Sequence, residues 1–339
     1  MTKDDRINAF KKLGDFLNNF SLENDSNSNH PLELEIKRSQ IFNKWFTQSN
    51  VRSAISGICY MLKQENLKNW MKDYTEPLQR KTVAVIMAGN IPIVGFHDFL
   101  SVLISGHAIK IKLSKDDNKL FPLIVSELVT INSEFKNLIS FSDNNLKGFD
   151  AIIATGSNNS KIYFDSYFSS YPSLIRGNRT SIAILNGQES LEERKGLAKD
   201  IFSYFGLGCR SITKLFIPRD YNLDLLFEVF YDYKDVALNN KYVNNYDYNK
   251  AVFLMGSNVI VENGFLILKE ENSSLHSPVS VLYYEYYDQI DALKKHLGTL
   301  SEEVQCICGD GYLPFGKTQM PELEDYADGV NTLEFLAKL

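Results

Sequence analysis

From residue 82 onward the chain alternates short apolar runs with helix-like segments, and this alternation constrains the fold more than any other feature. Apolar runs at residues 82–88, 108–113 and 150–156 are typical of buried strands, and helical patterns occupy residues 95–106 and 118–130. Strands that alternate with helices predict a parallel sheet with helices on its faces. Such sheets bind ligands at the carboxyl ends of their strands.

A second series of the same kind follows. Residues 181–186, 213–218 and 278–287 have strand patterns, and residues 189–205 have a helical one. Asn263-Gly264 lies between two apolar runs, which predicts a β-hairpin. The chain is therefore expected to hold a second α/β unit after the first.

The first 75 residues carry apolar residues at helical spacing, which predicts a helical segment before the first sheet.

The bulk composition excludes several classes of protein. A net charge of −6 argues against broad nucleic-acid binding. The longest uncharged apolar run, residues 83–96, is too short to span a bilayer. Because residues 1–12 also lack an apolar signal core, we expect a cytoplasmic protein without a membrane span.

The four cysteines are Cys59, Cys209, Cys306 and Cys308. Only the last two are close in sequence, and no second pair completes a zinc site, so we expect no metal. The QCIC stretch that holds them is typical of a buried strand. Reduced thiols fit a reducing compartment.

Cys209 stands out because it follows Gly-Leu-Gly in the stretch YFGLGCRSIT. The two glycines let other groups approach its sulfur closely. The residue is either a small apolar side chain in a loop or a nucleophile that is held open for a substrate. His276 precedes a strand and is flanked by small polar residues in SSLHSPVS, an unusual setting for a core histidine.

Polar residues also follow the first two predicted strands. Asn90 is either a turn residue or a carboxamide donor to a developing oxyanion. Lys112, Ser114 and Lys115 lie at and just beyond the second strand. The two lysines are either solvated charges or ligands of a phosphate group.

A third polar turn, ATGSNNSK, follows the strand at residues 150–156. Gly156 and Ser157 would offer backbone N–H groups and a hydroxyl at a helix N-terminus, which suits a pyrophosphate. A simple N-cap explains the same residues. No G-x-G-x-x-G follows any predicted strand, so the common dinucleotide fingerprint is missing.

Taken in order, these segments resemble the aldehyde dehydrogenase superfamily. The resemblance begins near residue 82 and continues to the C-terminus, with the order of the motifs preserved. It rests on five stretches, each of which resembles a motif of the superfamily. VAVIMAGNIPIVGFHDFLSVLISGHAIKIKLSKDD resembles the stretch from the oxyanion asparagine to the "KPSE" turn, and ATGSNNS resembles "TGS". IRGNRTSIAILN resembles "ELGGKSP", FGLGCRSITKLFIP resembles "GQxC", and LPFGKTQMPELEDYADGVNTLEFL resembles the "PFGG" tail.

More narrowly, FGLGCRS and DYADGVNTLEFL resemble the acyl-CoA reductase family, which includes the reductase subunit of the bacterial bioluminescence fatty-acid reductase complex. The resemblance implies NADPH-dependent reduction of a fatty acyl thioester to an aldehyde through an acylated cysteine. It places the nucleophile at Cys209 and the oxyanion asparagine at Asn90. The donor is acyl-CoA or an acyl-protein, and an acyl-transferring partner enzyme is one alternative.

Several positions depart from the superfamily pattern. The deacylating glutamate falls on Ile175, so an acyl-enzyme is expected to survive hydrolysis. The "KPSE" glutamate falls on Lys115, which favours a 2′-phosphate and hence NADPH over NADH. The glutamate that holds the nicotinamide ribose falls on Ser274. His276 falls where thioester-forming members often have a histidine, which makes it a candidate acid/base.

The resemblance implies an α/β fold of the aldehyde dehydrogenase type. Residues 1–175 would form the helical segment and a Rossmann-type cofactor domain, residues 176–312 the catalytic domain, and residues 313–339 a tail that returns to the core. The superfamily usually assembles by strand exchange, which implies a homo-oligomer. Two alternatives remain open: NAD(P)-dependent aldehyde oxidation, and a non-catalytic member that binds acyl groups or a partner.

Overall fold

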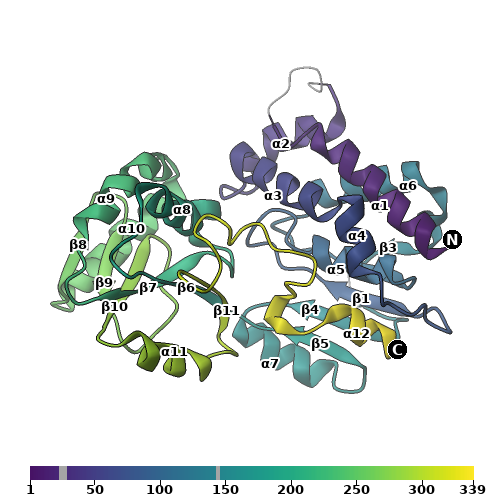
Figure 1. Ribbon diagram of the computed structural model, residues 1–339. Coiled ribbons are helices and arrows are strands. Elements are labelled where there is room, and N and C mark those ends of the chain that lie inside the picture. Colours follow the sequence, from purple (N-terminus) through teal and green to yellow (C-terminus); the bar gives the residue numbers. More distant parts are fainter. Residues whose placement is uncertain (23–28, 143–145) are drawn as a thin grey trace. The chain divides into compact units, whose positions relative to one another are not determined.

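The computed structural model describes residues 1–22, 29–142 and 146–339, and the fold is α/β, as the alternating pattern predicts (Figure 1). The chain divides into two compact units. Unit 1 comprises Met1–Asn178 and Pro321–Leu339, and unit 2 comprises Arg179–Met320. Each unit is built around a sheet of its own.

Among the described residues, the sheet of unit 1 has five parallel strands in the order β3-β2-β1-β4-β5. The chain runs outward from β1 to β3 and then continues with β4 and β5 on the other side of β1. In such a sheet, ligands bind beyond the carboxyl ends of the strands where the order reverses, here β1 and β4. The strands are β1 (Thr82–Ile86), β2 (Ala108–Lys112), β3 (Ile139–Phe141), β4 (Ala151–Thr155) and β5 (Ser173–Arg176).

Helices precede this sheet and connect its strands. The first helix begins with a capping box, in which Thr2 and Asp5 each accept a hydrogen bond from the other's backbone N–H. The helical N-terminal segment that the apolar spacing predicts is confirmed. The helices are α1 (Lys3–Asn18), α2 (Pro31–Phe42), α3 (Gln48–Met61), α4 (Gln64–Trp70), α5 (Phe96–Ile104), α6 (Leu120–Ile131) and α7 (Asn158–Tyr167).

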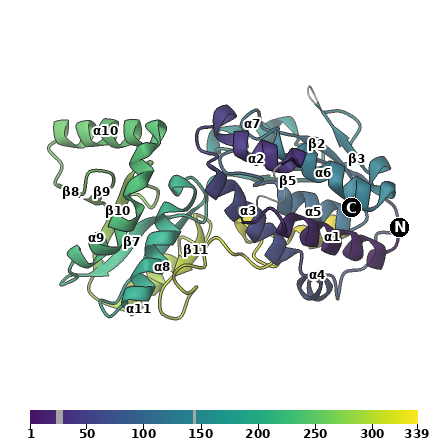
Figure 2. The ribbon, with the colours of Figure 1, turned by 90° about the horizontal axis from the view of Figure 1, so that it is seen from above.

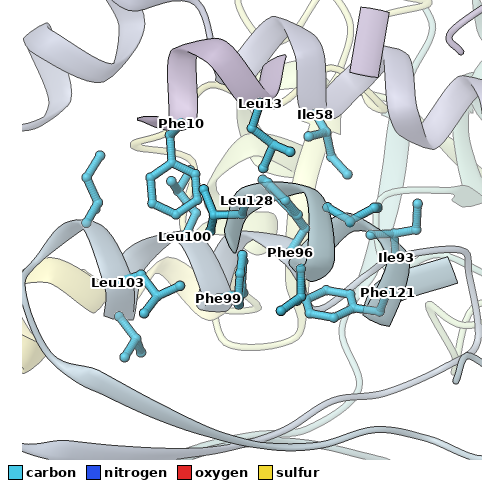
Figure 3. Close-up of a cluster of buried hydrophobic side chains, with 14 of the residues drawn as sticks. Phe10, Leu13, Ile58, Ile93, Phe96, Phe99, Leu100, Leu103, Phe121 and Leu128 are labelled. Carbon is cyan, nitrogen blue, oxygen red and sulfur yellow. The ribbon is translucent and has the colours of Figure 1, made fainter. Parts of the chain in front are cut away.

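The N-terminal helices and the helices of the sheet share one apolar core. Figure 3 shows Phe10 and Leu13 of α1 and Ile58 of α3 pointing toward Phe99 of α5 and Phe121 of α6. The ring centroids of Phe10 and Phe99 are 6.2 Å apart, and those of Phe99 and Phe121 are 5.2 Å apart, both edge to face. Each such pair contributes about 0.5–1.5 kcal/mol beyond its buried area. The N-terminal segment is therefore an integral layer of unit 1.

Two histidines hold the C-terminal segment, which ends in α12 (Thr332–Ala337), within unit 1. Nε2 of His97 lies 3.0 Å from the carbonyl oxygen of Leu323, and Nε2 of His107 lies 3.1 Å from that of Leu336. Nδ1 of His107 accepts a backbone N–H, so its Nε2 carries the proton and donates it. Burial lowers the pKa of both imidazoles, which keeps them neutral near pH 7.

The described part of unit 2 forms a six-stranded sheet in the order β11-β6-β7-β10-β9-β8. Its neighbouring strands are parallel except β8 and β9, which form the hairpin predicted at Asn263-Gly264. Gly264 has a φ of 92°, which glycine adopts without strain. The strands are β6 (Thr180–Ile184), β7 (Ile212–Pro218), β8 (Ile260–Glu262), β9 (Ile267–Glu270), β10 (Val281–Tyr287) and β11 (Val304–Cys308).

The helices of unit 2 surround this sheet (Figures 1 and 2). They are α8 (Leu191–Phe202), α9 (Asp224–Phe230), α10 (Asn240–Met255) and α11 (Ile290–Gly298). The QCIC stretch lies in strand β11, as predicted, but of its four residues only Cys308 is fully buried. Burial raises the pKa of the Cys308 thiol. None of the helices in the described ranges is long and apolar enough to cross a membrane.

Candidate active site

The loop after β1 carries Asn90, whose side chain is exposed. This loop is closely packed on both sides of Asn90. A Cβ on Gly89 would lie 2.5 Å from Oγ of Ser114, and a Cβ on Gly95 would lie 2.5 Å from Cγ of Met87. Real Cβ atoms do not approach so closely. Glycine at position 89 therefore lets the loop after β1 pack against the loop after β2, and glycine at position 95 lets the end of the loop after β1 pack against its own start.

The buried carboxylate of Asp117 fixes the backbone of the same loop. Ile93 has a φ of 58°, which is a strained value for a β-branched residue. Its backbone N–H donates to Oδ2 of Asp117 at 2.6 Å. Asp117 is 6% exposed, and desolvation raises its pKa from 3.8 to about 6. The sequence analysis missed Asp117, because nothing in the charged run KIKLSKDD separates it from its exposed neighbour Asp116.

The turn after β2 holds Lys112, Ser114 and Lys115. The side chain of Lys112 is half-buried and that of Lys115 is exposed. Oγ of Ser114 accepts a hydrogen bond from the backbone N–H of Asp116 at 3.2 Å, so this hydroxyl also shapes the turn. Since β1, β2 and β4 are parallel neighbours, this turn lies at the same edge of the sheet as Asn90.

The third polar turn follows β4 at that edge. Ser157 is the N-cap of α7, and its hydroxyl accepts from the backbone N–H of Ser160 at 3.2 Å. A Cβ on Gly156 would lie 2.8 Å from Cβ of Ser160, so packing against the helix requires glycine there. The N-cap interpretation of Ser157 is confirmed. The same turn directs the remaining N–H groups of the first helical turn outward, where an anion can bind.

Ile175 lies in β5 and pairs with Ala154 of β4. Its side chain is partly buried against a small apolar cluster that includes Phe168. The next residue, Arg176, forms a buried ion pair with Asp98, in which Nη1 of the arginine donates to both carboxylate oxygens at 2.6 and 2.7 Å. Strand β5 thus carries an apolar side chain at position 175, where the resemblance to the superfamily places the deacylating glutamate.

In unit 2, the segment before Cys209 has an unusual backbone. Tyr204, Phe205 and Gly206 have φ values of 53°, 57° and 77°. The helix predicted over residues 189–205 therefore ends at Phe202, because the buried rings of Tyr204 and Phe205 draw the chain into a left-handed turn. The loop that follows leaves Cys209 exposed.

Ser181 of β6 holds the backbone of this loop. Its hydroxyl donates to the carbonyl oxygen of Cys209 at 2.8 Å and lies 3.1 Å from Sγ of Cys306. The backbone N–H of Cys306 donates to the same hydroxyl at 3.2 Å. On the other side of the loop, Nε of Arg210 donates to the carbonyl oxygen of Thr318 at 2.5 Å. Sequence reasoning missed Ser181, since a serine within a strand carries no signal of such a contact.

Strand β7, which begins just after Cys209, also holds the loop of His276. Oγ1 of Thr213 donates to the carbonyl oxygen of Leu275 at 2.8 Å. Nζ of Lys214 donates to the carbonyl oxygen of Ser274 at 3.3 Å and pairs with a carboxylate of β10. His276 is exposed, and partial desolvation lowers the pKa of its imidazole below 6.5. The lysine inside the otherwise apolar strand TKLFIP is a sequence feature that could have indicated this contact between β7 and the loop of His276.

The candidate residues thus form two sets. The edge of the sheet in unit 1 gathers Asn90, the Lys112–Lys115 turn and the Gly156-Ser157 turn. Unit 2 connects Cys209 and His276 through β7. Within the ranges that the structure describes, no three His, Cys, Asp or Glu side chains cluster in a way that could hold a metal ion.

Comparison with solved structures identifies the fold. KauB, an aldehyde dehydrogenase from Pseudomonas aeruginosa, superimposes with a TM-score of 0.63 at 13% identity, over 91% of this chain and 76% of that one. An indole-3-acetaldehyde dehydrogenase solved with NAD+ gives 0.64 at 13% identity, over 87% and 69%. A 3,6-anhydro-L-galactose dehydrogenase gives 0.62 at 11%, over 92% and 76%. At such identities the likeness shows a shared fold.

Comparison of the sequence with protein families identifies the relationship more narrowly. A search of the curated proteins finds no match. The family model described as acyl-CoA reductase (LuxC) matches residues 21–228, which is more than half of the chain and includes both Asn90 and Cys209. The chain therefore belongs to the acyl-CoA reductase (LuxC) family, a family of oxidoreductases, and has the fold of the aldehyde dehydrogenases.

Proposed function

We propose that this protein reduces a fatty acyl thioester to the aldehyde, with NADPH, through an acyl group carried on Cys209. The observation that carries the proposal is the exposed thiol of Cys209, presented by a loop that left-handed residues and Ser181 hold in place. A nucleophilic cysteine needs both access and a fixed position. Membership of the acyl-CoA reductase family supports the choice of substrate.

In the first step, the thiolate of Cys209 attacks the thioester carbonyl of acyl-CoA or of an acyl-protein. The sulfur–carbon bond to Cys209 forms, and the bond to the departing thiol breaks. The lowered pKa of His276 leaves its imidazole neutral near pH 7. A neutral imidazole can take the proton of the cysteine thiol and return it to the departing thiolate.

The carboxamide of Asn90 and the backbone N–H of Cys209 are proposed to stabilise the tetrahedral oxyanion. Removal of one such donor usually costs about 10²–10³ in rate. The close packing of the loop around Asn90 supports this role, because a donor that is fixed in advance needs no reorganisation during the reaction.

The proposed fate of the acyl-enzyme follows from the residue at position 175, where the resemblance to the superfamily places the deacylating glutamate. Position 175 holds isoleucine, so no carboxylate at this position activates a water molecule. NADPH, when bound, supplies the hydride that converts the thioester carbon to the aldehyde level. The bond between this carbon and the sulfur of Cys209 would then break, which releases the aldehyde and regenerates the thiolate for a second acyl group.

The residues at the edge of the unit 1 sheet fit a nicotinamide dinucleotide. Gly156 and Ser157 start a helix at a strand end next to the reversal point, where a pyrophosphate can bind. Lys112 and Ser114 would hold the adenosine ribose. The exposed ammonium of Lys115 attracts a 2′-phosphate, which is why we propose NADPH.

Intact-protein mass spectrometry tests the proposal. The protein is mixed with acyl-CoAs from acetyl to palmitoyl, first without and then with NADPH. We expect an acyl adduct on Cys209 that disappears with NADPH as aldehyde accumulates. Cys209→Ala should abolish the adduct. The matched control Cys59→Ala should retain it, because burial raises the pKa of Cys59 to about 12 and keeps that thiol unreactive.

Two other results would favour the alternatives. NAD(P)-dependent formation of carboxylate from aldehyde would point to an aldehyde dehydrogenase of the usual superfamily type. A folded, NADPH-binding protein that never acquires an adduct, from acyl-CoA or from an acyl-protein, would point to a non-catalytic member. We further propose a cytoplasmic homo-oligomer, which size-exclusion chromatography with light scattering and cell fractionation can test.

A further inference from the structure

The register between β6 and β7 shifts by one residue just after the nucleophile loop. Ser181 of β6 is paired with Ile212 of β7. The next residue of β6, Ile182, is paired with Lys214, so Thr213 is an extra residue in β7. An extra residue of this kind, a β-bulge, changes the direction in which the neighbouring side chains point, and bulges are common beside active sites.

Because of this bulge, two successive side chains of β7 reach the same loop. In a regular strand they would point to opposite faces of the sheet. Here Oγ1 of Thr213 donates to the carbonyl oxygen of Leu275 at 2.8 Å. Nζ of Lys214 donates to the carbonyl oxygen of Ser274 at 3.3 Å, and the hydroxyl of Ser274 donates to that of His276 at 3.1 Å. The carbonyl groups of three consecutive residues are therefore held, two of them by β7.

The nucleophile loop is held at the same place. Oγ of Ser181, which lies beside the bulge, donates to the carbonyl oxygen of Cys209 at 2.8 Å. Oγ1 of Thr213 lies 3.5 Å from the carbonyl oxygen of Ser181. The loops of Cys209 and His276 are therefore both fixed to one short segment of the sheet, and groups that are held by strands keep their geometry more precisely than groups on free loops.

The burial of Lys214 is not explained by stability alone. Its side chain is 1% exposed, and its Nζ lies 5.0 Å from the centroid of the Phe216 ring. Its partner is the carboxylate of Glu285 on β10, 2.5 Å away and 26% exposed. Exchange of a buried ion pair for hydrocarbon of similar volume is often neutral or stabilising. A hydrocarbon side chain at position 214 could not donate to the carbonyl oxygen of Ser274.

We propose that Lys214 is a positioning residue for the transfer of the acyl group to Cys209 and that it acts through the backbone of the His276 loop. The inference rests on the proposed function, in which His276 moves the proton of the thiol. It adds the group that holds this imidazole in place. Because a misplacement of about 1 Å typically costs about 10² in rate, loss of this contact should slow the acylation step.

The first test removes the ammonium group and measures acylation of Cys209 by rapid-quench mass spectrometry over a range of dodecanoyl-CoA concentrations. We expect Lys214→Met to lower the maximal rate about tenfold or more and to leave the half-saturating concentration within about twofold. Lys214→Arg keeps a charged donor and should restore most of the rate. If Lys214→Met misfolds by circular dichroism, Lys214→Met/Glu285→Gln replaces it, because the double variant leaves no unpaired charge.

A control variant removes another lysine–glutamate pair of unit 2. Nζ of Lys250, on α10, lies 2.8 Å from Oε1 of Glu262 on β8. Lys250→Met should therefore acylate at the native rate.

A double-mutant cycle distinguishes positioning from a general loss of stability. His276→Ala removes the imidazole that Lys214 is proposed to hold. In this background Lys214→Met should change the acylation rate by less than about twofold, because two residues that act through one another are not additive. A purely structural role of Lys214 predicts the same loss with and without the imidazole.

The outcomes separate this inference from the proposed function. A native rate in Lys214→Met, or an equal loss in both backgrounds, would overturn the inference while acylation of Cys209 stands. A native rate in His276→Ala would also overturn it, since Lys214 would then have no catalytic group to position. A native protein that acquires no adduct from any thioester would refute the proposed function, and this inference with it.

Discussion

The backbone N–H of Ile93 donates a hydrogen bond to the buried carboxylate of Asp117, 2.6 Å away, and thereby ties the loop after β1 to the loop after β2. Ile93 has a left-handed φ of 58°, while its side chain is buried in the core of unit 1 (Figure 3). A strained residue of this kind persists only where the surrounding structure fixes it. Asn90 lies three residues before Ile93 in the same loop, so the hydrogen bond from Ile93 to Asp117 also restrains the position of Asn90.

Removal of the Asp117 carboxylate should impair acyl transfer. Asp117→Ala leaves the N–H of Ile93 without its acceptor and lets the Asn90 loop shift. A misplacement of about 1 Å typically costs about 10² in rate. We expect the rate of Cys209 acylation, followed by rapid-quench mass spectrometry, to fall by about that factor. The control Asp116→Ala removes an exposed neighbour and should acylate at the native rate; equal rates in both variants would refute the role of Asp117.

The raised pKa of Asp117 predicts a pH dependence of stability. Its ordinary value is 3.8 and its folded value is about 6, so in this window the folded protein binds more protons than the unfolded chain. The free energy of unfolding should therefore fall as the pH rises through the window, by at most about 3 kcal/mol. Asp117→Asn cannot titrate and should lack this component. Thermal unfolding of both proteins across the window measures it, and parallel curves would contradict the assignment.

Loss of the Ser181 hydroxyl should loosen the nucleophile loop. Ser181→Ala removes the hydrogen bond to the carbonyl oxygen of Cys209 and leaves that carbonyl without this donor. We expect a loss of about 0.5–1.5 kcal/mol in unfolding free energy and a slower acylation of Cys209. Ser181→Thr, which keeps the hydroxyl, should restore most of the rate. Ser203→Ala, which removes a local hydrogen bond at the end of α8, serves as the control.

Reversal of the charge at Lys115 should alter the choice of cofactor. A glutamate at this position repels a 2′-phosphate that the lysine attracts. We expect Lys115→Glu to lower the ratio of kcat/KM for NADPH to that for NADH by at least about tenfold, and the effect to weaken with added salt. Lys119→Glu makes the same charge change on an exposed lysine of the neighbouring turn and should leave the ratio unchanged. An unaltered ratio in Lys115→Glu would show that another group reads the phosphate.

Local sequence patterns were sufficient to predict the strands of the first sheet and the hairpin turn of the second. The apolar runs at β1, β2 and β4 and the Asn263-Gly264 hairpin follow from side-chain periodicity and from the φ that glycine allows. The end of α8 did not follow, because the helical pattern continues to residue 205 whereas the buried rings of Tyr204 and Phe205 turn the backbone left-handed. Local periodicity cannot report a competition that distant packing decides.

The sequence by itself determined the α/β alternation, the family and the residue types available at each strand end, because these depend on spacing and composition along the chain. Only the tertiary structure decided that Asp117 is buried beneath the Asn90 loop while Asp116 is exposed, that Ser181 holds the carbonyl of Cys209, and that β7 connects Cys209 with the His276 loop. Each of these contacts joins residues from different elements, and most of them lie far apart in sequence. Burial and hydrogen bonding at such points are set by how the elements pack, and no pattern of neighbouring residues encodes that directly.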